Sequence, residues 1–172
     1  MHVDGVVTAK IGNNGYIQSG GYGIYLYTQN KRWRFLQPGN HIDVIGMVSD
    51  YNGLLEITNI ESVELLQEGV PVPEPLNVRL EEVGEDLEAR LVYVGRVEIM
   101  EVEPHTGKGY NVLVRDREAR GIIRIDKYLI PYIEPEVFRK GAVVSLTATV
   151  GQYVDDYQLM LARIEHLVPV DK

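Results

Sequence analysis

The stretch Gly15–Tyr27, GYIQSGGYGIYLY, decides the fold, because it has the pattern of two strands joined by a glycine turn. Tyr16 and Gln18 alternate with an isoleucine before the turn, and aliphatic residues alternate with tyrosines after it. A period of two is typical of a strand that turns one face to a core. Gly20 and Gly21 interrupt the run where a hairpin must reverse. The sequence therefore predicts a hairpin with one aliphatic face in a core and one face that carries tyrosines.

The second half of the chain repeats the first, which predicts two copies of one barrel. LQPGNHIDVIGMVSDY (36–51) aligns with FRKGAVVSLTATVGQY (138–153) at a constant offset of 102 residues. The apolar positions keep their register across this offset, and a slip of one residue would turn each core face outward. Five short strands with a small helix between the third and the fourth describe the OB-fold. We predict an all-β protein of two tandem five-stranded OB-fold Greek-key barrels with short helices between elements. A pair of SH3-like barrels or one larger sandwich is the alternative.

A proline-rich segment separates the two halves. Residues 67–77, QEGVPVPEPLN, hold three prolines at alternate positions, a composition typical of an extended, stiff linker. We therefore expect module 1 to span residues 1–68, the linker 69–77 and module 2 78–172.

Composition and charge narrow the class of protein. The net charge of -8 excludes a generally basic surface. Residues 67–90 alone hold seven acidic residues against two basic ones, so the excess negative charge is concentrated between the modules. Cysteine is absent, which excludes disulfides and thiolate metal sites. No apolar run approaches the length of a membrane span and no secretory signal begins the chain, so we expect no membrane insertion.

The first group of candidate binding residues lies on the hairpin and its flanking loops, where OB-folds bind their ligands. Unpaired bases stack on such exposed aromatic rings. The alternative is that these tyrosines pack on one another or on the second barrel. The candidates for nucleic-acid binding in module 1 are Tyr16, Gln18, Tyr25, Tyr27, Trp33, Arg34 and Tyr51.

A second group lies on the corresponding strands of module 2, which hold the densest basic cluster in the chain. A basic groove bordered by tyrosines suits the backbone of a single nucleic-acid strand. The alternative is a solvated face, neutralised by the acidic residues that are interleaved with the arginines. The candidates for nucleic-acid binding in module 2 are Arg115, Arg117, Arg124, Lys127 and Tyr153.

Catalysis finds no support in the sequence. The histidines have no second histidine at the spacing of metal ligands, and the serines lack the glycine frame of a nucleophile elbow. We therefore expect a protein that is not an enzyme, with no catalytic residue, no metal and no cofactor.

Three segments of module 1, YIQSGGYGIYLY, LQPGNHIDVIGMV and YNGLLEI, resemble the OB-fold nucleic-acid-binding modules attached to bacterial secreted nucleases and cell-surface phosphoesterases. Ser19 stands where that family usually has aspartate. LEARLVYVGRV and GIIRIDKYL resemble the partner module of the pair. The resemblance covers nearly the whole chain, and the family's catalytic domain is a separate segment.

The two groups of candidate residues predict non-catalytic binding of single-stranded DNA or RNA, by stacking in module 1 and by arginine contacts in module 2. The resemblance is to nucleic-acid-binding modules and agrees with this function. It also implies a nuclease or other catalytic domain as a partner and an extracellular or cell-surface location. A protein-docking or spacer module that binds no nucleic acid is the alternative.

Overall fold

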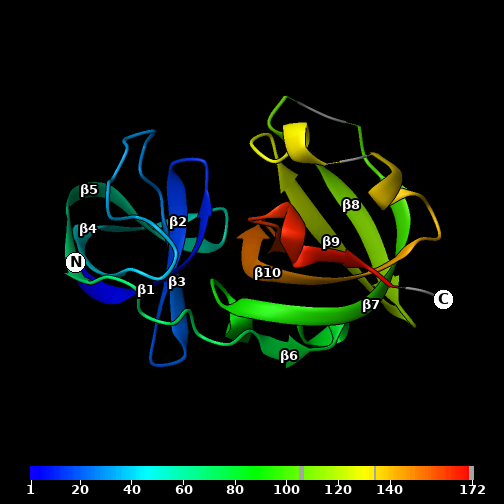
Figure 1. Cartoon of the computed structure of the whole chain (residues 1–172), viewed down its shortest axis with the longest axis horizontal. Helices are drawn as coiled ribbons and strands as arrows, with labels where there is room; N and C mark the ends of the chain where they lie inside the picture. The colour runs from blue at the N-terminus through cyan, green and yellow to red at the C-terminus, as the bar shows by residue number, and fades with distance from the viewer. Residues whose placement is uncertain (105–106, 134, 171–172) are drawn as a thin grey trace.

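Two β-barrels lie side by side in the computed structural model, which describes residues 1–104, 107–133 and 135–170 (Figure 1). The helical elements among the described residues are short 3-10 turns. The predicted all-β fold of two tandem five-stranded OB-fold barrels is therefore confirmed.

The first barrel closes in the order β1-β2-β3-β5-β4, with β4 returning to pair with β1. β3 and β5 pair in parallel, and the other neighbours are antiparallel. Its core contains the aliphatic residues of the hairpin, among them Ile17 and Leu26, together with Ile42, Val44 and Ile57. The strands are β1 His2–Ile11, β2 Asn14–Ser19, β3 Tyr22–Leu26, β4 His41–Tyr51 and β5 Leu54–Gln67.

The second barrel repeats this connectivity as β7-β8-β9-β11-β10, and β10 pairs with β7 to close it. The short strands β6 and β12 extend the sheet beside β7 and β10. β10 has the bounds of β4 shifted by 102 residues, so the repeat seen in the sequence is a structural repeat. The strands are β6 Leu76–Val78, β7 Leu91–Val102, β8 Gly109–Asp116, β9 Ala119–Asp126, β10 Val143–Tyr153, β11 Asp156–Met160 and β12 Leu167–Pro169.

The segment between the barrels runs from residue 68 to residue 75 without a strand, as its prolines favour. Leu76 and Asn77, which the sequence assigned to the linker, pair with β7 instead and belong to the second sheet. Short turns complete the fold: η1 Leu80–Glu82, η2 Glu85–Leu87, η3 Ile130–Tyr132, η4 Pro135–Phe138 and η5 Ile164–His166.

A third apolar cluster joins the two barrels. It consists of Ala9, Ile11 and Tyr16 from module 1 and Ala89 from module 2, with Met160 packed against it. The barrels therefore share a buried contact. No helix in the described part of the chain is long and apolar enough to cross a membrane.

Candidate nucleic-acid interface

The tyrosine face of the β2–β3 hairpin is buried against module 2. Tyr16 is 1 % exposed, and its ring centroid lies 4.8 Å from that of Tyr25. Gln18 is also buried, and its Oε1 accepts a hydrogen bond of 2.6 Å from the backbone N–H of Leu91. Burial raises the pKa of Tyr16 well above its ordinary value, with smaller contributions from nearby groups, and it also raises that of Tyr25.

The segment Glu88–Leu91 lies across this face in the place where an OB-fold would hold a ligand. The carboxylate of Glu88 accepts a hydrogen bond from the backbone N–H of Leu55 at 3.1 Å, and Ala89 packs against Gly23. A base cannot reach Tyr16 or Gln18 in this arrangement. Tyr16 and Gln18 therefore form part of the contact between the barrels, which is the alternative that the sequence left open, whereas Tyr27 is 39 % exposed and stays a predicted binding residue.

Two other predicted aromatic residues lie on the acidic side of the junction. Tyr51 and Tyr153 are more than half exposed and are the last residues of β4 and β10, just before the turns that follow these strands. These turns touch, because the backbone N–H of Val154 donates to the carbonyl oxygen of Asn52 at 2.6 Å. Asp50 is next to Tyr51 in the chain, and Asp155 and Asp156 follow Tyr153 closely. Carboxylates in these turns repel phosphate, so this side of the junction is unfavourable for a nucleic-acid backbone.

The predicted arginine cluster of module 2 is partly neutralised. The guanidinium of Arg115 lies 2.9 Å from a carboxylate oxygen of Glu98 on the neighbouring strand. Arg124 donates to the side chain of Asn111 at 3.1 Å and to the backbone oxygen of Lys108 at 3.0 Å. Arg117 is exposed in the β8–β9 turn. The structure thus places Arg115 and Arg117 at one end of β8 and β9, whereas Arg124 lies close to the β7–β8 connection.

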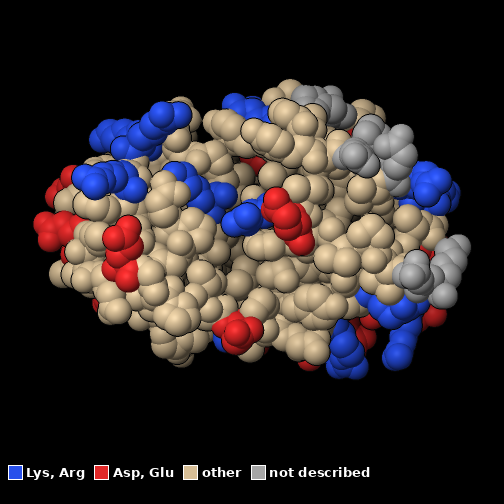
Figure 2. Space-filling model, in the orientation of Figure 1, with Lys and Arg blue, Asp and Glu red and all other residues tan. Residues whose placement is uncertain are grey.

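Module 1 concentrates its cations in one part of the chain. Its four cations lie between residues 10 and 34, and residues 5–42 contain no Asp or Glu at all. Lys31, Arg32 and Arg34 belong to the β3–β4 segment, and Lys10 lies near the end of β1. Among the residues that the structure describes, none of these four side chains forms a salt bridge. Figure 2 shows basic side chains gathered over this part of the barrel and at the junction.

Trp33 and Arg34, both predicted site residues, have different roles in this segment. Trp33 is half-buried and packs on the core of module 1. The guanidinium of Arg34 is exposed and lies 5.3 Å from the ring centroid of Phe35. Trp33 therefore anchors the segment, while the basic residues around it face the solvent.

The basic side of module 1 continues onto module 2. A Cβ placed on Gly12, in the β1–β2 turn, would lie 2.3 Å from the ring of Tyr128, so only glycine allows this ring to pack there. The ammonium group of Lys127 lies 5.1 Å from the centroid of the same ring. The β1–β2 turn is also tied to the β3–β4 segment, since Asn13 donates to the backbone oxygen of Asn30 at 3.1 Å. We use the name basic ridge for Lys10, Lys31, Arg32, Arg34, Lys127 and Arg163.

The positive charges of Lys10 and Arg32 in the ridge repel each other, which affects the pKa of Lys10. Burial lowers the pKa of Lys10, and the positive charge of Arg32 lowers it further. An anion bound beside these two groups would reduce the repulsion. The ridge therefore has the electrostatic character of a polyanion site.

Exposed aromatic rings lie among the cations of the ridge. Tyr128 is 47 % exposed and Tyr132, at the end of η3, is 70 % exposed. Tyr132 and Arg163 line the same small hollow beside η5. Solvent-facing tyrosines beside basic side chains are the combination that binds unpaired bases together with their phosphates.

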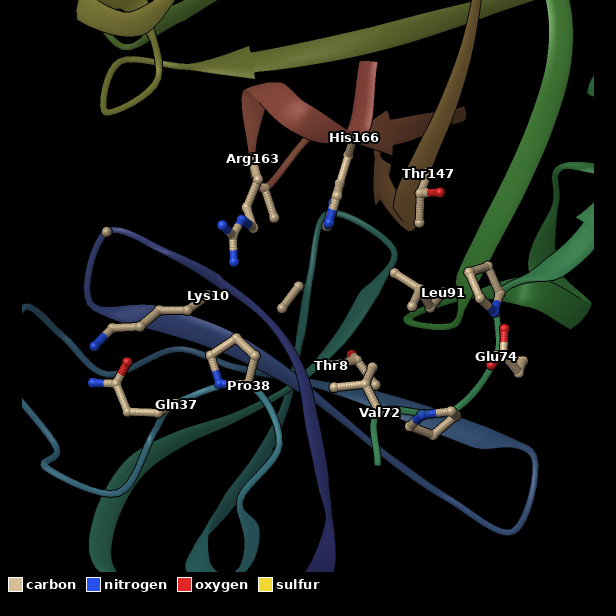
Figure 3. Close-up of a pocket in the computed structure, with 15 residues that line it drawn as sticks. Thr8, Lys10, Gln37, Pro38, Val72, Glu74, Leu91, Thr147, Arg163 and His166 are labelled. Atoms are coloured by element: carbon tan, nitrogen blue, oxygen red, sulfur yellow. The ribbon is translucent and has the colours of Figure 1, made fainter. Parts of the chain in front are cut away.

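A cavity of about 620 Å³ opens where the ridge crosses from one barrel to the other. Arg163 and His166 point into it from module 2, and Lys10 and Gln37 lie on the opposite wall (Figure 3). Linker residues 72–75 form a further wall. The Nδ1 atom of His166 is buried and has no hydrogen-bond partner in the described part of the protein.

Sequence reasoning found Arg34 and Lys127 of the ridge but missed Lys10, Lys31, Arg32 and Arg163. For module 1 the sequence did contain a signal that indicates these cations, namely the stretch 5–42 without acidic residues. Tyr128 and Arg163 carried no such signal, since only folding brings them beside Lys10. Across residues 1–104, 107–133 and 135–170, no three histidine or acidic side chains gather where they could hold a metal ion.

The comparisons with known proteins concern the fold. No protein-family model matches the chain, and no curated protein is similar to it. A murine DNA-binding protein, solved bound to double-stranded DNA, matches with a TM-score of 0.50 and 10% identity over 99% of this chain and 97% of that one. The HINb domain of p204 matches with a TM-score of 0.44 and 10% identity over 98% of this chain and 96% of its own. At such identities the first match supports a shared fold along the whole chain.

Proposed function

We propose that this protein binds single-stranded nucleic acid along the basic ridge and catalyses no reaction on it. The distribution of charge in module 1 carries the proposal: within the described residues its four Lys and Arg side chains form no salt bridge, and no Asp or Glu lies between residues 5 and 42. The Gly12–Tyr128 contact extends this side to Lys127 of module 2. A backbone of regularly spaced phosphates matches a row of cations that spans both barrels.

A single strand fits the ridge better than a duplex does. Tyr128 and Tyr132 are exposed among the cations, and only unpaired bases expose the faces that stack on such rings. Stacking of this kind is worth about 1–3 kcal/mol per base. The murine DNA-binding protein of similar fold was solved with double-stranded DNA. A duplex is therefore the comparison that the experiment needs.

The experiment is fluorescence anisotropy with labelled oligo-dT of roughly twenty nucleotides, at several salt concentrations, against a duplex of equal length. We expect the affinity for the single strand to be higher and to fall as salt rises. The double substitution Arg32→Gln/Arg34→Gln should weaken binding. It should also lower the slope of log affinity against log salt by about 0.7 for each lost phosphate contact.

The double substitution Arg120→Gln/Lys140→Gln is the matched control. Arg120 and Lys140 are exposed residues of module 2 outside the ridge, and replacing them also removes two positive charges. An equal loss with this variant would assign the effect to net charge, and no binding at low salt would contradict the function. If no binding is seen at low salt, both barrels would instead be a docking scaffold for a protein partner. On the sequence resemblance, we also propose that the protein acts beside a nuclease, and co-purification with such an enzyme tests this partnership.

A further inference from the structure

The cavity between the barrels has two ends of opposite charge. Lys10 of module 1 and Arg163 of module 2 lie toward one end, while Glu74 of the linker lies at the other (Figure 3). Arg163 pairs with Glu165 through its Nε only, at 3.4 Å, and both side chains are more than half exposed. Such an exposed pair is weak and leaves the guanidinium able to bind an anion.

Neutral hydrogen-bonding groups lie between these ends. Between them the cavity is lined by the hydroxyl-bearing Thr8 and Thr147 and by the ring of His166. The ring of His166 lines the cavity, whereas its Nδ1 atom is buried and lacks a partner among the described residues. Leu91 and Ala162 add apolar surface. A cavity of about 620 Å³ lies within the range of small-ligand sites.

A nucleic-acid strand cannot run through this cavity with its charges satisfied. A phosphate bound by Arg163 lies at the basic end, but a strand that continued through the cavity would bring its next phosphate toward the carboxylate of Glu74. A strand that ends inside the cavity avoids this repulsion, and a terminal phosphate adds negative charge at the basic end. The linker wall contains Pro73 and Pro75, which hold the backbone in an extended conformation.

We propose that the inter-barrel cavity binds the terminal nucleotide of a strand and selects ends that carry a phosphomonoester. This inference rests on the proposed function, because it states where a strand bound along the basic ridge would end and in which orientation it would lie. Arg163 would bind the phosphate, the positive charge of Lys10 would add to the attraction, and the threonines and His166 would contact the sugar and base.

The test compares three oligo-dT probes of equal length by anisotropy: one with a 5′ phosphate, one with a 3′ phosphate and one with two hydroxyl ends. We expect one phosphorylated end to bind roughly tenfold tighter than the hydroxyl-ended probe, as charge-assisted hydrogen bonds provide. Arg163→Gln should remove this preference. Lys31→Gln, in the ridge but outside the cavity, should weaken all three probes and leave their ratio unchanged.

The outcomes separate the two proposals. Salt-dependent binding of all three probes with equal affinity would overturn the terminal site and leave the proposed function standing. If no oligonucleotide binds, calorimetry with thymidine monophosphate and thymidine decides: binding of the monophosphate alone upholds the cavity as a phosphomonoester site. Failure of both nucleosidic probes would overturn it.

Discussion

Gly23 marks the closest approach of the two barrels at the scale of single residues. A Cβ at this position would lie 2.2 Å from the carbonyl oxygen of Ala89 and 2.5 Å from its carbonyl carbon. Both atoms belong to the backbone, so they cannot move without shifting the segment that leads into β7. The glycine is therefore required by close packing, and it allows Glu88–Leu91 to lie on the tyrosine face.

Gly23→Ala should lower the free energy of unfolding by about 1–3 kcal/mol, because overpacked contacts cost that much when the backbone must give way. Urea unfolding followed by circular dichroism measures the change. Gly84→Ala is the control, since an added Cβ there meets no atom within 4 Å and its φ of -173° suits any residue. Its effect should stay within about 0.5 kcal/mol. A Gly23→Ala protein as stable as the parent would show that the barrels are not in close contact in solution.

At the scale of elements, the turn η2 is fastened to β11. The hydroxyl of Tyr157 donates to a carboxylate oxygen of Glu85 at 2.6 Å. The pKa of Tyr157 is raised from 10.0 to about 12, mainly because this hydrogen bond favours the protonated phenol, with smaller contributions from burial and nearby carboxylates. The bond holds the chain just before Glu88–Leu91, the segment that covers the tyrosine face.

The pH dependence of this bond follows from the direction of the shift. The folded pKa lies above the unfolded one, so the stabilisation is complete below pH 10.0 and is lost as pH rises through about 12. We expect Glu85→Gln to lower the pKa of Tyr157 toward 10. The phenolate absorbance of the two proteins should then differ by one tyrosine across this window. Superimposable titration curves would contradict the bond.

At the scale of the whole molecule, the shared cluster around Tyr16 and Ala89 couples the barrels. Neither module can unfold without exposing apolar surface of the other, so we expect one cooperative transition. The single tryptophan, Trp33, lies in module 1, and its fluorescence reports that module alone. Circular dichroism reports both modules.

The two signals should give the same midpoint in urea for the natural sequence. They should separate in Gly23→Ala, because that substitution weakens the contact without touching either barrel core. Separate midpoints in the unmodified protein would mean that the barrels unfold independently, and the cavity between them would then lack a fixed shape.

The sequence by itself determined the two barrels. Alternation of apolar residues in Gly15–Tyr27 defines the hairpin, and the offset of 102 residues places β4 and β10 at equivalent positions. These patterns are local or repeat at a fixed spacing, and they record which residues share a face. Arg34 and Lys127 of the ridge were also within reach of the sequence, since basic residues on OB-fold strands and loops are visible there.

Only the tertiary structure decided what covers each face. Periodicity groups Tyr16 with Gln18 but carries no information on whether water, a ligand or another barrel lies above them. Module 2 buries this face through Ala89, which is more than sixty residues away in the chain. Likewise, Lys10, Lys127 and Arg163 come together only through contacts such as that of Gly12 with Tyr128. Long-range packing, which brings distant charges within reach of one another, therefore determined the proposed binding surface.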